Sequence, residues 1–215
     1  MLRYLALSSV VLSVACSDFG IRDAPPVPPA QPPGKDEDDV GGPPDWQSCF
    51  EGYHGEYSNL TADHPDIRRR SRDDASTNPD DLDWWDDASF QRFDPNLDMG
   101  SNWWPVDEGL EDDPAYFAVR WRAWVRAWSN TTMTVTLGSS DDAWVYIEGQ
   151  PAIENPGLQE FNPQQYSVEL SGGQYPIEVL FAHRDIEHVS SFRFRVLSGD
   201  VSICYPDFGA SEEAE

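Results

Sequence analysis

Lysine is nearly missing from this chain of 215 residues: Lys35 is the only one, and arginine supplies the remaining positive charge. A mechanism that depends on lysine is therefore excluded for the folded part, because Lys35 lies in a stretch with too little apolar content to pack. The formal net charge of −25 argues against nucleic acid or an anionic bilayer as the partner of the folded part. Such an excess is compatible with a cation-binding surface, although it is more often a solvated face.

Familiar catalytic and cofactor motifs are also missing. The chain has no G-x-S-x-G nucleophile elbow, no phosphate-binding glycine loop and no C-x-x-C zinc pattern. Nothing in the sequence selects an acid/base pair from its many carboxylates. A hydrolase of cell-wall or matrix polymer is therefore a weaker hypothesis than a binding domain or a structural or protein-interaction module. The chain is not predicted to be an enzyme.

The first apolar run, residues 5–14, is too short to span a membrane as a helix. It follows the positive charge of Arg3, so residues 1–15 are predicted to be an export signal. The small residues before Cys16 resemble a bacterial lipobox, in which the cysteine is acylated and becomes the mature N-terminus. This interpretation predicts a lipid anchor in the outer membrane, facing the periplasm or the cell surface. A plain secretory signal is the alternative.

Residues 16–45 are predicted to form a disordered tether. Its proline-rich part, residues 24–34, favours extended polyproline II and a semi-rigid spacer, and an acidic run follows at 35–39. The folded domain is predicted to cover residues 46–205, with an acidic, frayed tail at 206–215.

Strand patterns dominate the second half of the chain. Residues 116–128 alternate, with Val119 and Trp121 on one face and Arg120 and Arg122 on the other, which is typical of a half-buried strand. The same alternation predicts strands at residues 132–137, 143–147, 166–170, 175–181 and 192–196. Two stretches between them lack it: residues 152–165 are predicted to be a polar connection, and 182–191 a surface loop that carries His183 and His188.

Two adjacent carboxylates, Asp141 and Asp142, follow the predicted strand at 132–137. Successive side chains on an extended chain point in opposite directions, so this pair can converge on one cation only if the backbone between them is distorted. A cis peptide bond would do so. The alternative is an ordinary solvated turn, because serine and aspartate favour turns by bonding to their own backbone.

The run from this turn through Trp144 to Gly149 resembles the "DD, then an aromatic-aliphatic strand, then G" core of the fourteen-kilodalton protective-antigen domain family. It is most similar to the fibro-slime subgroup. Residues 49–60 (CFEGYHGEYSNL) and 116–127 (YFAVRWRAWVRA) resemble further strands of the family. The resemblance implies an all-β fold, an antiparallel, jelly-roll-like β-sandwich. It also implies calcium-dependent carbohydrate binding of the kind found in adhesins.

The resemblance also implies a set of ligands. In sugar-binding members the Asp pair, joined by a cis peptide, holds a calcium ion that in turn holds sugar hydroxyls. Calcium is thereby predicted on Asp141 and Asp142, with Asp185 and Glu187 of a later loop as the remaining ligands. The expected partner is a carbohydrate or an extracellular matrix polymer. A metal-free structural or protein-interaction module of the cell envelope is the alternative.

Three tryptophans are the predicted ligand-binding aromatics. Trp103 and Trp104 lie in a stretch, residues 89–114, that is longer than the family norm, and Trp144 follows the acidic turn. Paired tryptophans can stack on sugar rings through their flat apolar faces. Capping an exposed end of the core is the commoner use of tryptophan and stays open for Trp103 and Trp104.

With Cys16 taken by the lipid, Cys49 and Cys204 remain, one near each end of the predicted domain. In an oxidising compartment outside the inner membrane they could form a disulfide, and two unrelated thiols are the alternative.

Overall fold

Strand β6 (Phe117–Ala127) shows how the alternating sequence becomes structure. Val119, Trp121 and Val125 are buried, whereas Arg120 and Arg122 on the opposite face are partly exposed. β-Branched and aromatic side chains pack well on a pleated, half-buried surface, so this sequence favours a strand with one face in the core. The predicted strand is confirmed.

The computed structural model describes residues 21–23, 43, 46, 49–64, 84–85, 88–101, 103, 116–184 and 189–206. The predicted export signal, the lipidation site Cys16 and the acidic tail at 206–215, apart from Pro206, lie outside the described residues. Within the described ranges, no helix is long and apolar enough to cross a membrane.

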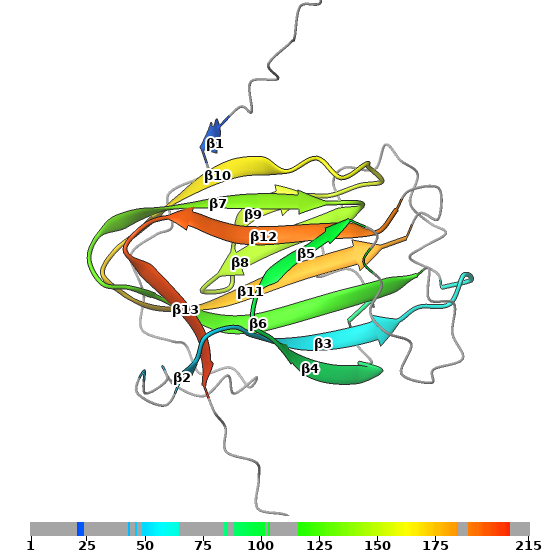
Figure 1. Ribbon diagram of the computed structural model, residues 1–215, viewed down its shortest axis with the longest axis horizontal. Coiled ribbons are helices and arrows are strands. Elements are labelled where there is room, and N and C mark those ends of the chain that lie inside the picture. Colours follow the sequence, from blue (N-terminus) through cyan, green and yellow to red (C-terminus); the bar gives the residue numbers. More distant parts are fainter. Residues whose placement is uncertain are drawn as a thin grey trace, which may run out of the picture.

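Every secondary-structure element among the described residues is a strand (Figure 1). They are β1 (Ile21–Asp23), β2 (Cys49–Phe50), β3 (Tyr53–Asn59), β4 (Phe90–Asp94), β5 (Leu97–Ser101), β6, β7 (Thr131–Ser139), β8 (Asp142–Ile147), β9 (Gln150–Asn155), β10 (Gln164–Leu170), β11 (Gly173–His183), β12 (Ser191–Ser198) and β13 (Val201–Pro206).

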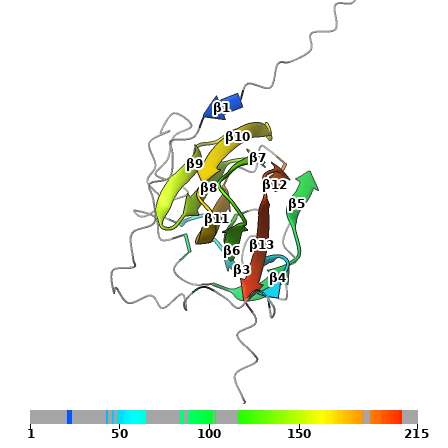
Figure 2. The ribbon, with the colours of Figure 1, turned by 90° about the vertical axis from the view of Figure 1, so that its left-hand side faces the viewer.

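The strands form two sheets packed face to face. The smaller sheet has the order β1-β10-β7-β12-β5, and the larger has the order β2-β13-β6-β11-β8-β9, with β3 joined to β6 and β4 joined to β3. All pairings are antiparallel except that of β1 with β10. Figure 2 looks along the strands and separates the two layers. The predicted β-sandwich is confirmed.

Aromatic side chains fill the space between the sheets. Trp121 of the larger sheet stacks on Phe192 of the smaller sheet, with ring centroids 4.9 Å apart. Phe181 lies 4.8 Å from Phe192 and 5.7 Å from Phe117, so the rings form one continuous cluster. Each fully buried ring of this size contributes roughly 2–3 kcal/mol of hydrophobic stabilisation.

Strand register brings the acidic turn to one end of the sandwich. Asp142 pairs with Ala182 in the β8–β11 ladder, and Ser139 pairs with Phe192 in the β7–β12 ladder. The residues after β7, those ending β11 and those beginning β12 therefore meet at the same end, although they are far apart in the sequence.

Three stretches differ from the sequence-based prediction. Residues 152–155 of the predicted polar connection belong instead to β9, which pairs with β8 around a bulge, so its buried side chains do not alternate regularly. Residues 90–101 of the long insertion form β4 and β5, for which no strand was predicted. Residues 21–23 of the predicted tether form β1 on the edge of the smaller sheet.

A buried carboxylate links the start of this insertion to the core. Asp94 Oδ2 accepts hydrogen bonds from the Tyr57 hydroxyl (2.5 Å) and the Trp121 indole N–H (2.8 Å), and Arg92 Nε donates to Oδ1 (2.8 Å). Burial, with Asp94 beside it, raises the pKa of Tyr57 above its ordinary value, so the phenol keeps its proton and remains a donor. A buried carboxylate is tolerated here because each oxygen has donors.

Replacing this carboxylate should be costly. We expect Asp94→Ala to lower the free energy of unfolding by roughly 3 kcal/mol, because the Tyr57 hydroxyl and the Trp121 indole N–H lose their acceptor inside the core. Urea unfolding measures the change. Asp98→Ala is the matched control, since Asp98 is one third exposed and its ion pair with Arg193 should contribute less than about 1 kcal/mol. Equal losses in the two variants would contradict the importance assigned to Asp94.

A disulfide closes the domain. Cys49 of β2 and Cys204 of β13 are bonded, with Cα atoms 5.7 Å apart and a sequence separation of 155. The predicted pairing is confirmed. Because the bridge joins two strands that are far apart in the sequence, β2 and the last strand β13, it restricts the unfolded chain strongly.

Removing this bridge should therefore destabilise the fold. We expect the Cys49→Ser/Cys204→Ser variant to lose roughly 2–5 kcal/mol of unfolding free energy. Denaturant unfolding with and without reductant measures the loss. Reductant should lower the midpoint of the native chain and leave the double variant unchanged; a native midpoint insensitive to complete reduction would show that the bridge does not stabilise the domain.

Candidate functional site

The turn between β7 and β8 buries four consecutive polar residues. Ser139, Ser140, Asp141 and Asp142 have no exposed surface. Asp141 adopts φ = 80°, a left-handed conformation that is rare outside glycine, whereas the peptide bonds of the described residues are all trans. The cis peptide bond that the resemblance implied between Asp141 and Asp142 is therefore wrong, and the backbone is distorted here by the left-handed Asp141.

Asp141 ties the turn to two other segments. Its Oδ2 accepts the backbone N–H of Arg184 (2.8 Å) and lies 3.2 Å from Nδ1 of His183. Its Oδ1 accepts the backbone N–H of Gln159 (3.3 Å). His183 was predicted to lie on a surface loop; this is wrong, because it is the last residue of β11 and is fully buried.

Asp142 forms a buried ion pair. Nε of Arg184 donates to Oδ2 (2.6 Å), Nη2 lies 3.4 Å from Oδ1, and both side chains are fully buried. The backbone N–H of Gly157 also donates to Oδ1 (2.6 Å). Burial raises the pKa of Asp142, and the hydrogen bonds from Arg184 and Gly157 oppose this rise only in part.

The serines bind the turn to the smaller sheet. The backbone N–H of Ser140 donates to the carbonyl of Ser191 (2.8 Å), and the backbone N–H of Ser191 donates back to the Ser140 hydroxyl (2.7 Å). Ser139 donates to the carbonyl of Asp141 (2.7 Å) and accepts from the Asn155 amide (2.9 Å). The turn is thus fixed in one position by both sheets.

These contacts decide how well the Asp pair fits calcium. Calcium takes roughly six to eight oxygen ligands. Each of the four carboxylate oxygens of Asp141 and Asp142 already faces an N–H donor, and the guanidinium of Arg184 lies against the pair. Within the described part of the chain, no three His, Cys, Asp or Glu residues come together as a metal site. The described residues therefore do not fit a calcium ion. Asp185 and Glu187 lie outside the described residues, and their role as ligands stays a prediction.

The predicted ligand-binding tryptophans lie in two different places. Trp144 points away from the main core into a second cluster on the outer face of the larger sheet, 6.5 Å from Trp84 and 6.0 Å from Trp85 between ring centroids. It is fully buried and offers no open ring face. Trp103 packs on the core, 6.0 Å from Trp121. Trp104 lies outside the described residues.

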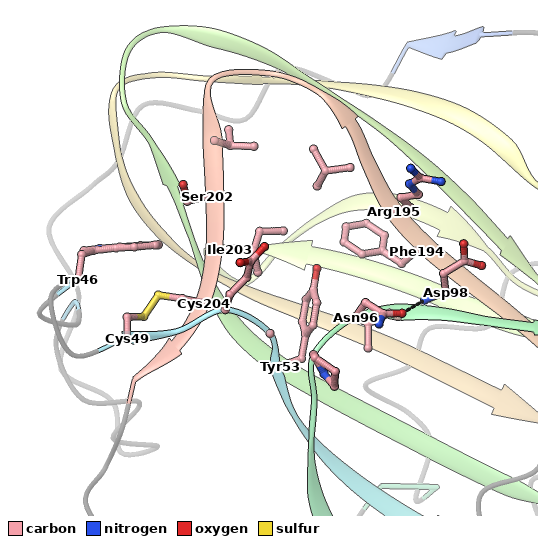
Figure 3. Close-up of a pocket in the computed structure, with 16 residues that line it drawn as sticks. Trp46, Cys49, Tyr53, Asn96, Asp98, Phe194, Arg195, Ser202, Ile203 and Cys204 are labelled. Carbon is pink, nitrogen blue, oxygen red and sulfur yellow. Dashed lines mark hydrogen bonds between the residues drawn. A yellow bond between two sulfur atoms is a disulfide. The ribbon is translucent and has the colours of Figure 1, made fainter.

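An open cleft lies toward the other end of the sandwich (Figure 3). Strand β13, which forms one wall of the cleft, pairs with the last residues of β6. His183, which lies beside the Asp pair, pairs with the first residue of β6. The cleft and the Asp pair therefore lie toward opposite ends of this strand. The cleft has a volume of about 630 Å³. Its deepest lining residues are Tyr53, Leu97, Phe194 and Cys204, and its exposed polar lining residues are Glu51, Asn96, Asp98, Arg195 and Ser202.

The cleft combines aromatic surface with fixed polar groups. The Tyr53 ring packs edge-on against Phe194, with centroids 6.4 Å apart, and its hydroxyl points into the cleft in Figure 3. Burial raises the pKa of Tyr53, so the hydroxyl remains a neutral donor. Asn96 accepts the backbone N–H of Asp98 (3.1 Å), and Asp98 accepts from Arg193 (2.6 Å).

Neither Arg184 nor the cleft was singled out by the sequence prediction. Arg184 follows a predicted strand, but its link to Asp142 depends on the β8–β11 register, which the sequence did not provide. The cleft residues come from four separate segments, and one of these, the β4–β5 turn, lies in the stretch for which no strand was predicted.

A family comparison agrees with this architecture. The family model described as the PA14 domain matches residues 56–209, more than two thirds of the chain. No curated protein sequence matches the chain.

Three solved structures are similar to the chain at low identity. A PA14 sugar-binding domain from an RTX adhesin has a TM-score of 0.52 and 15% identity, over 73% of this chain and 98% of that chain. The epithelial adhesin 9 A domain of Candida glabrata, in complex with Galb1-4GlcNAc, has a TM-score of 0.48 and 12% identity, over 77% and 94%. A β-glucosidase from Kluyveromyces marxianus, in complex with glucose, has a TM-score of 0.45 and 12% identity, and the match covers 69% of this chain but only 16% of the enzyme.

Proposed function

The chain belongs to the PA14 domain family, and from this premise we propose that it is an exported, lipid-anchored envelope protein whose β-sandwich binds carbohydrate. The RTX adhesin domain that shares its fold is described as sugar-binding. Assignment to the fibro-slime subgroup stays a prediction from the acidic turn and Trp144.

The observation that carries the proposal is the cleft. Ligand sites are concave, with apolar walls and a few polar groups that fix orientation. A sugar has hydroxyls that both donate and accept hydrogen bonds, which suits the Tyr53 hydroxyl that points into the cleft (Figure 3) and the exposed Asn96 and Asp98. We place the sugar in this cleft, because the Asp pair at the other end is buried.

Calcium remains a prediction from family resemblance. The carboxylate oxygens of the Asp pair already accept hydrogen bonds from N–H groups and do not fit a calcium ion. The proposed carbohydrate binding is therefore not assigned to calcium. Measuring binding in chelator and in calcium tests the prediction directly.

A structural or protein-interaction module of the envelope is the second candidate function. The internal satisfaction of Asp141 and Asp142 favours it, because the buried carboxylates offer no open surface to a ligand. A polysaccharide hydrolase is the third, and it would convert a bound glycan into products.

A glycan array followed by titration calorimetry tests the proposed function. We expect the full chain to bind a subset of glycans. Tyr53→Phe, which removes one hydroxyl, should weaken the tightest of these by about 2–10-fold, since one hydrogen bond is lost. Asn96→Ala should weaken binding similarly.

Asn162→Ala is the matched control, because Asn162 is exposed in the loop before β10, away from the cleft. It should bind as the native chain does. A complete absence of bound glycans would reject the proposed function in favour of the interaction module. Binding that Tyr53→Phe and Asn96→Ala leave unchanged would keep the function and reject the cleft, and loss of binding in chelator would assign a role to calcium.

Lipid anchoring is tested separately. In a bacterial host that processes lipoproteins, we expect the native chain to incorporate labelled fatty acid and to fractionate with the membrane. Cys16→Ser should lose both properties, while Cys49→Ser/Cys204→Ser should keep the label. Export of Cys16→Ser with unchanged membrane fractionation would indicate another anchor.

A further inference from the structure

The Asp pair has a cation of its own. The Arg184 guanidinium contacts both oxygens of Asp142, at 2.6 and 3.4 Å, and its backbone N–H binds Asp141 at 2.8 Å. Arg184 is only 4% exposed, and both carboxylates are fully buried. Buried carboxylates require a nearby positive charge or hydrogen-bond donors, and Arg184 supplies both from a single residue.

A second cation would meet repulsion in this place. A calcium ion bound to Oδ2 of Asp142 would lie within a few ångströms of the guanidinium that already contacts that oxygen at 2.6 Å. Like charges so close together in a buried site repel strongly. Binding would require Arg184 to leave, and the guanidinium also lies over the ring of Trp84, 5.7 Å from the ring centre.

The geometry of the turn matches this role. The left-handed Asp141 aims its carboxylate at the backbone N–H of Arg184, so one residue is held by both members of the pair. Gly157 and Gln159 donate to the remaining oxygens from the loop after β9. The pair thereby joins the β7–β8 turn, the end of β11 and this loop through hydrogen bonds.

We propose that Arg184 is the built-in counter-ion of the Asp141–Asp142 pair and takes the place of calcium. The domain therefore holds this end of the sandwich together without a metal ion. This inference does not depend on the proposed function, since it concerns the stability of the fold.

Thermal unfolding of the purified full chain, in chelator and in millimolar calcium chloride, tests the proposal. We expect the native midpoint to be the same in both. Arg184→Met keeps the length of the side chain but leaves a buried carboxylate uncompensated, and its midpoint should fall by roughly 10 °C. Arg193→Met is the matched control, because Arg193 makes an Nε–carboxylate contact of the same 2.6 Å length while one third exposed, and it should change the midpoint little.

The double variant Asp142→Asn/Arg184→Met shows that the loss comes from the unpaired charge. It removes the carboxylate's charge along with the arginine, so it should be more stable than Arg184→Met alone. If Arg184→Met does not fold, folding of the double variant supports the same conclusion.

Three results would overturn the proposal. One is a calcium-dependent rise of the native midpoint that Asp142→Asn abolishes, which would place calcium on the pair. Another is a loss in Arg184→Met no greater than in Arg193→Met. The last is a double variant no more stable than Arg184→Met.

Discussion

Hydrogen bonding along the two edges of β6 organises the larger sheet. One edge pairs with β11 along the full length of β6. The other edge is divided: β3 pairs with residues 117–122, and β13 pairs with residues 124–127. Because two strands share one edge, they must diverge where they meet, near Ala123. Tyr53 begins β3 and Cys204 lies in β13, so the cleft opens at this fork, and both cysteines of the disulfide line it.

Arginine holds the buried negative charge of this acidic chain. Asp94 lies beside Arg92 in one part of the sandwich, and Asp142 lies beside Arg184 at one end. A guanidinium suits such places because it stays charged and presents several N–H groups in a fixed plane. The sequence has a single lysine, so arginine supplies the positive charge in these internal ion pairs. Surface pairs such as Arg193 with Asp98 are more exposed and contribute less.

The sequence predicted the parts of the fold that depend on local alternation. The period-2 pattern of β6, β7, β8, β10, β11 and β12 follows directly from one buried and one exposed face. It failed for β9, where a bulge lets Ala152 and Ile153 both be buried, and for β4 and β5, whose short strands carry few apolar residues. The acidic turn was located correctly, but Arg184 was not predicted as the partner of Asp142. The two residues meet because β8 pairs with β11, and the register of this pairing cannot be read from the sequence. The cleft could not be predicted for the same reason, since its lining residues come from segments that are far apart in the sequence.

The short strand β1 has a geometric consequence for the proposed lipid anchor. Ile21 pairs with Gln165 at the edge of the smaller sheet, five residues after Cys16. Five residues of fully extended chain span at most roughly 18 Å. With a lipid on Cys16, Ile21 of β1 is therefore kept within that distance of the bilayer surface, whatever the length of the proline-rich segment that follows. Of the two edges of the smaller sheet, the anchor then holds the β1 edge close to the membrane, with β10 one strand further in.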